Sequence, residues 1–235
     1  MAVRGPRGPG RVDHARLARV VARCGDGWRV DYEAVRRSSD LAAYRREIAA
    51  ADPEVLDRDE RLAFWLNAHN ATLLALVAER MPVTTVHEID GLFDRVRSHV
   101  GRRDMTLAEM ARGGGRLGHP LAWAALSRAS VGSPPLRAYG GAGVAAELAA
   151  NARRYLADEQ RGARRAGRRV LVTRALLWGS GDLAPVPALP AAGTRALTAA
   201  RPSRLLPAVR PLLPPGLADA RRLGFLPHDW SVNGG

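Results

Sequence analysis

Apolar residues recur at helical spacing in several parts of the chain, and the longest such run lies between residues 59 and 80. Asp57 and Glu60 form the sequence pattern of a capping box at its start, and Met81-Pro82 ends it. Shorter runs predict further helices over 16–24, from about 33, over 40–51, from Leu107 to the glycines at 113–115, and over 145–157.

Extended segments are predicted to be few and short. Residues 97–102 resemble a hairpin with a glycine at its turn, and Arg169–Thr173 has the pattern of a strand whose partner the sequence does not identify. Phe225–Trp230 is expected to return to the core as a further strand. Periodicity leaves residues 121–127 open between a buried strand and a helical turn. The fold class predicted is α/β of the mixed α+β kind, a single domain that is mostly helical with a small sheet.

The length of 235 residues and a hydrophobic content of 46% suit one domain with a proper core. Residues 1–12 contain Gly, Pro and Arg without periodicity, which predicts a disordered tail. Residues 13–234 are expected to form the single domain. This range includes a segment rich in Pro and Ala, 183–219, in which helices are expected at 194–200 and after Ser203.

Two amide side chains stand on the long apolar helix, where a core should be apolar. Asn67 and Asn70 lie one helical turn apart, and a buried amide without partners costs about 1–3 kcal/mol. They are therefore expected either to fix neighbouring loops, around 131–136 or 225–229, or to line a pocket. His69 lies between them, and a lone histidine on an apolar helix is more commonly a satisfied core residue than a ligand.

The formal net charge is +13, and every one of the 36 Lys and Arg residues is arginine. Such a charge ordinarily indicates nucleic acid or an anionic membrane as a partner. Because Ala, Gly, Pro and Arg dominate the composition, a very GC-rich genome explains the arginine content more simply. Nucleic acid is therefore an unlikely partner on composition alone, and a continuous basic face would be needed to support it.

The single cysteine, Cys24, excludes an intramolecular disulfide and a cysteine-ligated metal cluster. The histidines lack the spacing of a zinc site, and no metal or other cofactor is expected. No apolar run reaches the roughly 18 residues of a membrane span, and the first residues lack the uninterrupted apolar stretch of a signal peptide. These patterns favour a cytoplasmic protein without a membrane partner.

The segment FWLNAHNATLL, residues 64–74, resembles the signature FWINxYNAL of the domain of unknown function 547 family. Further blocks resemble that family in the same order, among them AALSRASVGSPPLRAY, AELAANARRYL and FLPHDWSVN. The resemblance spans about residues 13–234. It identifies the chain as a divergent member of a family that has no assigned function.

The resemblance implies a site at which this chain departs from its relatives. The family suggests a Glu-His pair and a cysteine block, which together would supply a thiol nucleophile. Ala111-Arg112 stand at the Glu-His positions, Arg128 at the first cysteine and Ser133 at the second. A guanidinium remains protonated and cannot serve as a base or nucleophile at ordinary pH.

We therefore expect a degenerate, non-catalytic member that binds a small anionic ligand or a protein. The candidate binding residues are Arg112, Arg128, Ser133, Asn67, Asn70 and His69. The alternative is a hydrolase or acyl-transfer enzyme rebuilt around Ser133 or His69, which leaves enzymatic activity open. A purely structural loop, with its turn fixed by Ser133-Pro134-Pro135, is also compatible with the sequence.

Overall fold

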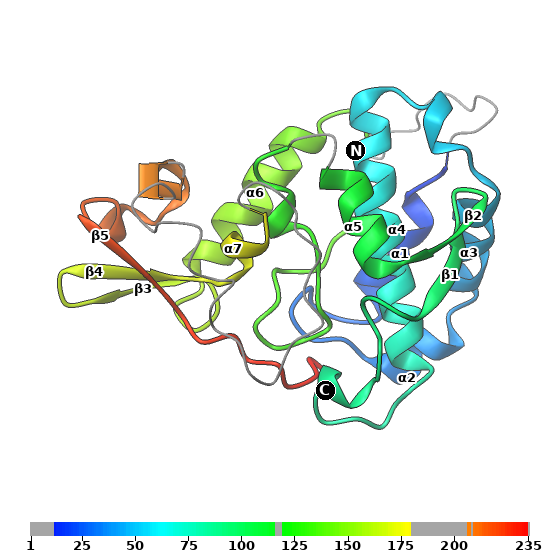
Figure 1. Cartoon of the computed structure of the whole chain (residues 1–235), viewed down its shortest axis with the longest axis horizontal. Helices are drawn as coiled ribbons and strands as arrows, with labels where there is room; N and C mark the ends of the chain where they lie inside the picture. Colours follow the sequence, from blue (N-terminus) through cyan, green and yellow to red (C-terminus); the bar gives the residue numbers. More distant parts are fainter. Residues whose placement is uncertain (1–11, 116–118, 180–205, 208, 235) are drawn as a thin grey trace.

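One buried helix organises the molecule. The computed structural model describes residues 12–115, 119–179, 206–207 and 209–234, and α4 (Arg58–Ala78) runs through the centre of its helical part (Figure 1). The Asp57 side chain accepts a hydrogen bond from the Glu60 backbone N–H at 2.8 Å and so caps the helix. Every residue from Leu62 to Ala78 is buried, because a helix that is apolar on all sides has to be covered on all sides.

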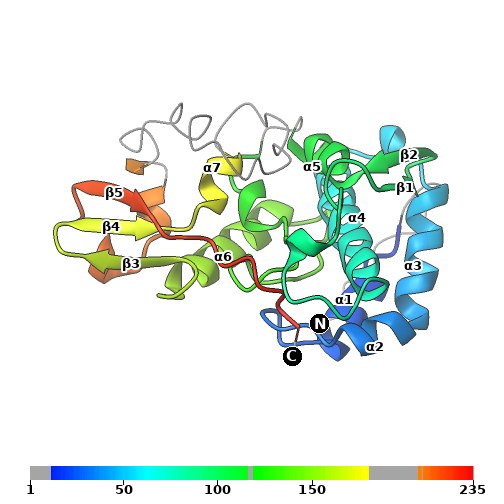
Figure 2. The same ribbon diagram turned by 60° about the horizontal axis from the view of Figure 1, so that its bottom comes forward.

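The other helices of this part surround α4 (Figures 1 and 2). Those in contact with it are α2 (Tyr32–Arg37), α3 (Ser39–Ala50), α5 (Leu107–Gly115) and α6 (Val144–Ala157), while α1 (Ala15–Arg23) packs on α3. Asp31 caps α2 and Ser38 caps α3, each by accepting a backbone N–H three residues ahead. The helices expected from the apolar spacing are thus all present.

Helix α5 spans the predicted residues. Thr106 Oγ1 accepts from the Glu109 N–H at 3.2 Å, and the Glu109 carboxylate accepts from the Thr106 N–H at 2.8 Å, which is a capping box. The three glycines at 113–115 form its last described residues. A Cβ at Gly113 would lie 2.8 Å from the Trp65 ring, so this glycine permits close packing of α5 on α4.

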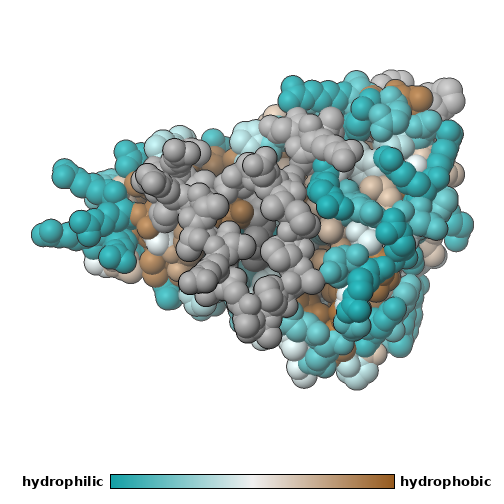
Figure 3. Space-filling model, in the orientation of Figure 1, coloured by the Kyte–Doolittle hydropathy of each residue, from teal (hydrophilic) through white to brown (hydrophobic). Residues whose placement is uncertain are grey.

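The strands form two separate small sheets. The hairpin predicted at 97–102 consists of β1 (Arg97–Val100) and β2 (Arg103–Thr106). The second sheet has the order β3-β4-β5, with β3 (Ala163–Ala166) antiparallel and β5 (Arg222–Phe225) parallel to β4 (Arg169–Val172). It projects away from the helices around α4, and the surface at its outer end is hydrophilic (Figures 2 and 3).

The apolar core is divided in the same way, between the helices around α4 and the β3-β4-β5 sheet. One apolar cluster lies around α1 to α5, a second joins α6 to the β3-β4-β5 sheet and to α7 (Ala175–Gly179), and a third lies between α4 and α6. The ambiguous segment 121–127 contains a single 3-10 turn, Ala122–Ala124, and no strand. The mixed, mainly helical fold predicted from the sequence is confirmed.

The C-terminal segment differs from its prediction. Phe225–Trp230 was expected to be a strand, but β5 ends at Phe225 and residues 226–234, here called the C-terminal strip, continue in extended form. Pro227 has no N–H to donate and cannot continue a ladder. The strip pairs instead on both sides, since the Val131 N–H donates to Ser231 O (2.8 Å) and the Val232 N–H to Thr84 O (2.9 Å).

Several predicted features belong to parts of the chain that the structure does not describe. The predicted tail up to residue 11, the helix expected at 194–200 and the start of the one expected after Ser203 lie outside the described residues. Among the helices that the structure describes, none combines the length and the apolar character required to cross a membrane.

Candidate functional site

Two asparagines of α4 fix the loop that carries the candidate site. Asn70 donates to Ala125 O at 2.8 Å and accepts from the Ser127 N–H at 3.1 Å. Asn67 forms a similar pair with the backbone of Tyr139, at 2.7 and 2.9 Å. Both amides are buried. They act as anchors, although the anchored segments are 125–127 and 139 and not the loops at 131–136 or 225–229 that were expected.

The anchored loop meets the C-terminal strip at Gly132. The Gly132 N–H donates to Asp229 O at 2.9 Å, and a Cβ at this position would lie 2.8 Å from Nδ1 of His228. Ala129, one turn earlier, adopts a left-handed backbone with φ of 57°, a conformation that costs a residue with a side chain on the order of 1 kcal/mol. The loop is therefore held in a specific shape against His228.

A directed chain of hydrogen bonds joins two serines to this histidine. Ser133 Oγ accepts from the backbone N–H groups of Arg128 (3.0 Å) and Ser130 (3.1 Å), which fills both acceptor sites of the hydroxyl. Its proton is therefore directed to Ser130 Oγ, 3.0 Å away, and the proton of Ser130 to His228 Nε2, at 2.9 Å. This network assigns the ring proton of neutral His228 to Nδ1.

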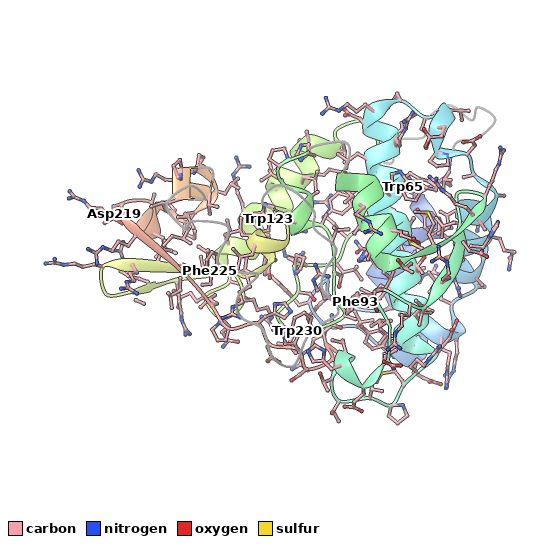
Figure 4. All side chains as sticks on the ribbon, viewed as in Figure 1. Trp65, Phe93, Trp123, Asp219, Phe225 and Trp230 are labelled. Carbon is pink, nitrogen blue, oxygen red and sulfur yellow. The ribbon has the colours of Figure 1, made fainter. Side chains whose placement is uncertain are left out.

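Arg128 brings a positive charge into the same region. Its side chain is buried, with the guanidinium carbon 5.6 Å from the centre of the Phe93 ring. Burial lowers the pKa of Arg128 to about 10, so the group is still charged at neutral pH. Phe93 and Trp230, labelled in Figure 4, mark two neighbours of the cluster, because the Trp230 ring lies 4.3 Å from that of His228.

The cationic field acts on two histidines. Burial, followed by Arg128, lowers the pKa of His228 to about 3, and Arg174 and His87 also lower it while Asp229 raises it. Burial is also the main reason that the pKa of His69 is lowered to about 4, with a further contribution from Arg128. Both imidazoles are therefore neutral at pH 7. We call Arg128, Ser130, Ser133 and His228 the polar cluster.

The sequence-predicted residues divide between the polar cluster and its surroundings. Arg128 and Ser133 belong to it, Asn70 anchors its loop, and His69 bonds to Asn70 Oδ1 at 3.2 Å within reach of the Arg128 charge. Arg112 is half-buried on α5, where it contributes to a lowered pKa of Glu109. Among the contacts recorded for the described residues, none joins Arg112 to Arg128, so their shared cleft stays a prediction.

Two members of the cluster were not among the sequence-predicted residues. Ser130 is one of three serines in the 127–133 block, and His228 belongs to FLPHDW, which was expected only to anchor the last strand. They are 98 positions apart, and no local spacing connects them. The available signal was that both blocks resemble the same family.

The cluster contains hydroxyls, imidazole and guanidinium but no carboxylate or thiol. Within the described part of the chain, no three side chains of His, Cys, Asp or Glu are placed to hold a metal ion. Cys24 is buried elsewhere, in the core around α1, and burial raises the pKa of its thiol. The chemistry available here is hydrogen bonding, positive charge and, at Ser130, a hydroxyl bonded to a neutral histidine.

The fold and the cluster thus describe a mixed, mainly helical protein in which a central asparagine-bearing helix positions a serine- and arginine-containing loop. Residues 53–156 match the family model described as "Protein of unknown function, DUF547", which supports the resemblance found in the sequence. No curated protein and no solved structure matches the chain. The matched segment includes α4, α5 and the anchored loop, while His228 lies outside it.

Proposed function

We propose that the polar cluster binds a small anion, of the carboxylate or phosphate class, without covalent catalysis. The observation that carries the proposal is the buried guanidinium of Arg128, which lies over the Phe93 ring and whose charge acts on His228, the partner of Ser130. Charge-assisted hydrogen bonds from arginine to carboxylate or phosphate are among the strongest in proteins. A ligand would approach past His228, the half-buried member of the cluster.

The electrostatic balance at the cluster favours an anion. After burial, which is the largest cause, Arg128, Arg174 and His87 lower the pKa of His228, and Asp229 raises it. The part of the shift that comes from these three positive groups reflects a field that would stabilise a negative charge. Inside a protein the effect is larger than in water because the effective dielectric constant is lower.

The low pKa of His228 argues against general-base catalysis. Burial, followed by Arg128, lowers this pKa from 6.5 to about 3, which corresponds to roughly 5 kcal/mol of lost proton affinity at about 1.4 kcal/mol per pKa unit. An efficient catalytic base has a pKa near the working pH. Ser130 is thus positioned toward a base that resists taking its proton, whereas Arg128 keeps its positive charge at all ordinary pH values.

Titration with inorganic phosphate and with acetate, followed by calorimetry, tests the proposal. Wild type is expected to bind at least one of them saturably, and Arg128→Gln to bind about ten- to a hundred-fold more weakly, as expected for losing one charge-assisted hydrogen bond of about 1.5–3 kcal/mol. Arg128→Lys should retain part of the affinity, and Arg46→Gln, a change at an exposed site on α3, should leave it unchanged.

The pH dependence supplies a readout that misfolding would not imitate. A bound anion offsets the field on His228 and raises the pKa of this residue, so wild-type affinity should increase as the pH falls from 7 to 5. His228→Gln should abolish that increase. Absence of binding by wild type, or equal binding by Arg128→Gln, would contradict the proposal.

A second candidate function, a serine hydrolase or acyl-transfer enzyme, is favoured by one observation. Ser130 Oγ and His228 Nε2 are 2.9 Å apart, with the serine as donor, which is the arrangement of a nucleophile and its base. The serine that meets a histidine is thus Ser130, and not Ser133 as the sequence suggested. A fluorophosphonate probe, which phosphonylates a reactive serine with loss of fluoride, distinguishes the two functions.

Under the anion-binding proposal, the probe should leave the mass of the intact protein unchanged. Labelling of wild type that persists in Ser133→Ala and disappears in Ser130→Ala would establish the enzyme instead.

A further inference from the structure

The outer end of the β3-β4-β5 sheet is unusually rich in arginine. Exposed arginines occupy β3, the turn after it, the start of β4 and the start of β5: Arg164, Arg165, Arg168, Arg169, Arg221 and Arg222. Figure 3 shows this end of the molecule as a hydrophilic projection, and Asp219, labelled in Figure 4, lies there too.

The register of the strands puts three of these arginines on one face. Arg164 pairs with Leu171 across β3 and β4, and Arg169, two residues before Leu171, points to the same side. Arg169 in turn pairs with Arg222 across β4 and β5. The opposite face carries Ala163, Val170 and Val172 and is buried against α6. Each strand therefore contributes one arginine to a single solvent-facing surface, here called the arginine face.

The arginine face is electrostatically unfavourable when nothing is bound to it. Neighbouring strands are about 4.8 Å apart, so Arg169 and Arg222 are direct cross-strand neighbours, and like charges in such pairs are destabilising. Within the described residues, Arg164, Arg169 and Arg222 form no ion pair with a carboxylate. Asp219 pairs with Arg165, which belongs to the other side of the sheet.

The arrangement of charges is distinct from a general excess of arginine. Where the chain is helical, arginines lie beside carboxylates, as Arg16 and Arg19 do with Asp40 and as Arg36 and Arg37 do with Glu33. Between residues 160 and 174 the sequence has six arginines and no Asp or Glu, and of these only Arg161 and Arg165 form ion pairs within the described residues, with Asp158 and Asp219. Drift in base composition explains the number of arginines but not this separation from acidic residues.

We propose that the arginine face binds the phosphate backbone of double-stranded nucleic acid without reading its sequence. Arginine is suited to phosphate because its planar guanidinium donates two parallel hydrogen bonds. This proposal departs from the expectation, based on composition, that nucleic acid is an unlikely partner.

Two features favour a duplex over other polyanions. The turn between β3 and β4 is formed by Gly167 and Arg168 and offers no large apolar side chain to insert into a lipid bilayer. The arginine face carries no aromatic ring on which an unpaired base could stack, and Phe225 of β5 pairs with Val172 on the buried side. The remaining chemistry on this face is positive charge at the spacing of neighbouring strands.

The test measures binding of the full chain to a fluorescently labelled 20-base-pair DNA of arbitrary sequence, by anisotropy between 50 and 200 mM salt. The variant Arg164→Gln/Arg169→Gln/Arg222→Gln removes the arginine face. The matched control, Arg23→Gln/Arg29→Gln/Arg46→Gln, removes three exposed arginines outside the β3-β4-β5 sheet, on α1, on α3 and on the segment between α1 and α2. Both variants change the net charge equally.

Wild type should bind the DNA. Removing the arginine face should weaken binding on the order of 10²-fold at 0.1 M salt. It should also reduce the slope of log affinity against log salt concentration by about 2.7, for three phosphate contacts. The control should bind within about three-fold of wild type, and Arg→Lys at the three positions should restore most of the affinity.

Three results would overturn the proposal. They are no binding by wild type at 50 mM salt, equal losses in the two glutamine variants, and binding to vesicles of phosphatidylserine and phosphatidylcholine but not to DNA. All six substituted side chains are exposed, and circular dichroism is expected to show native folding for each variant.

Discussion

Replacing Asn67 by leucine tests the most specific structural role in this protein. The Asn67 side chain pairs with both the N–H and the C=O of Tyr139, and Asn67 and Tyr139 are both buried. Asn67→Leu keeps the approximate size of the side chain and removes both partners at once. The Tyr139 backbone then has two buried polar groups without hydrogen bonds, and each such group costs about 1–3 kcal/mol.

The expected loss is therefore about 2–5 kcal/mol, after allowing for the small gain from burying a more apolar side chain. This is a large part of the roughly 5–15 kcal/mol that stabilises an ordinary domain. Urea unfolding followed by tryptophan fluorescence measures it, provided that the dependence on urea is the same for both proteins.

Thr72 supplies a matched control on the same helix. Its hydroxyl is buried and, among the described residues, has no hydrogen-bond partner. Thr72→Val replaces this hydroxyl by a methyl group of similar size, so we expect no loss of stability and a gain of up to about 1 kcal/mol. If Asn67→Leu unfolds within about 0.5 kcal/mol of wild type, the anchoring argument is wrong.

Two further predictions concern packing and pH. Gly113→Ala should lower stability by about 1–3 kcal/mol because its Cβ would meet the Trp65 ring at 2.8 Å, whereas Gly140→Ala, with no atom within 4 Å of the added Cβ, should be nearly neutral in thermal unfolding. Burial lowers the pKa of His14 and of His69 to about 4, so the unfolded chain binds more protons than the folded one between pH 6.5 and 4. Stability should fall by about 2 kcal/mol per histidine between pH 7 and 5, and urea unfolding that is independent of pH in this window would refute the assignment.

Much of the fold could be predicted because the responsible interactions are local. Asp57 with Glu60 and Thr106 with Glu109 define helix starts through contacts three residues apart, and the structure contains both helices. Gly101 was likewise sufficient to place the β1–β2 turn. Such signals are complete within one turn of the chain, so a single sequence reveals them.

The sequence was less informative where contacts between residues far apart in the chain determine the structure. Gly113 stands near the predicted end of α5, but its close packing on Trp65, 48 positions away by number, left no local signal. The partners of Arg169–Val172 lie on both sides of it, and one, β5, joins it in parallel from more than 50 residues further on. No local pattern specifies such pairings.

The candidate site likewise combines features that local sequence signals predicted with features that depend on distant contacts. Asn67 and Asn70 stood out because amides on an apolar helix require partners, and their burial and hydrogen bonds agree with that argument. Which loops they hold depended on the tertiary fold. The pairing of Ser130 with His228 could not be predicted for the same reason, since it exists only once the C-terminal strip lies against the anchored loop.

The C-terminal strip gives the polar cluster a measurable dynamic property. Its backbone is held by isolated hydrogen bonds to several segments, Thr84, Ala129, Val131 and Gly132 among their residues, and not by a continuous ladder, although it carries the only imidazole bonded to Ser130 among the described residues. Segments of this kind open locally at lower free energy than a helical core. In hydrogen–deuterium exchange, the amides of Val232 and Asn233 should therefore exchange well before those of α4. A molecule that occupies the polar cluster should slow the exchange of these two amides first, which makes the strip an internal reporter of occupancy even when the ligand is unknown.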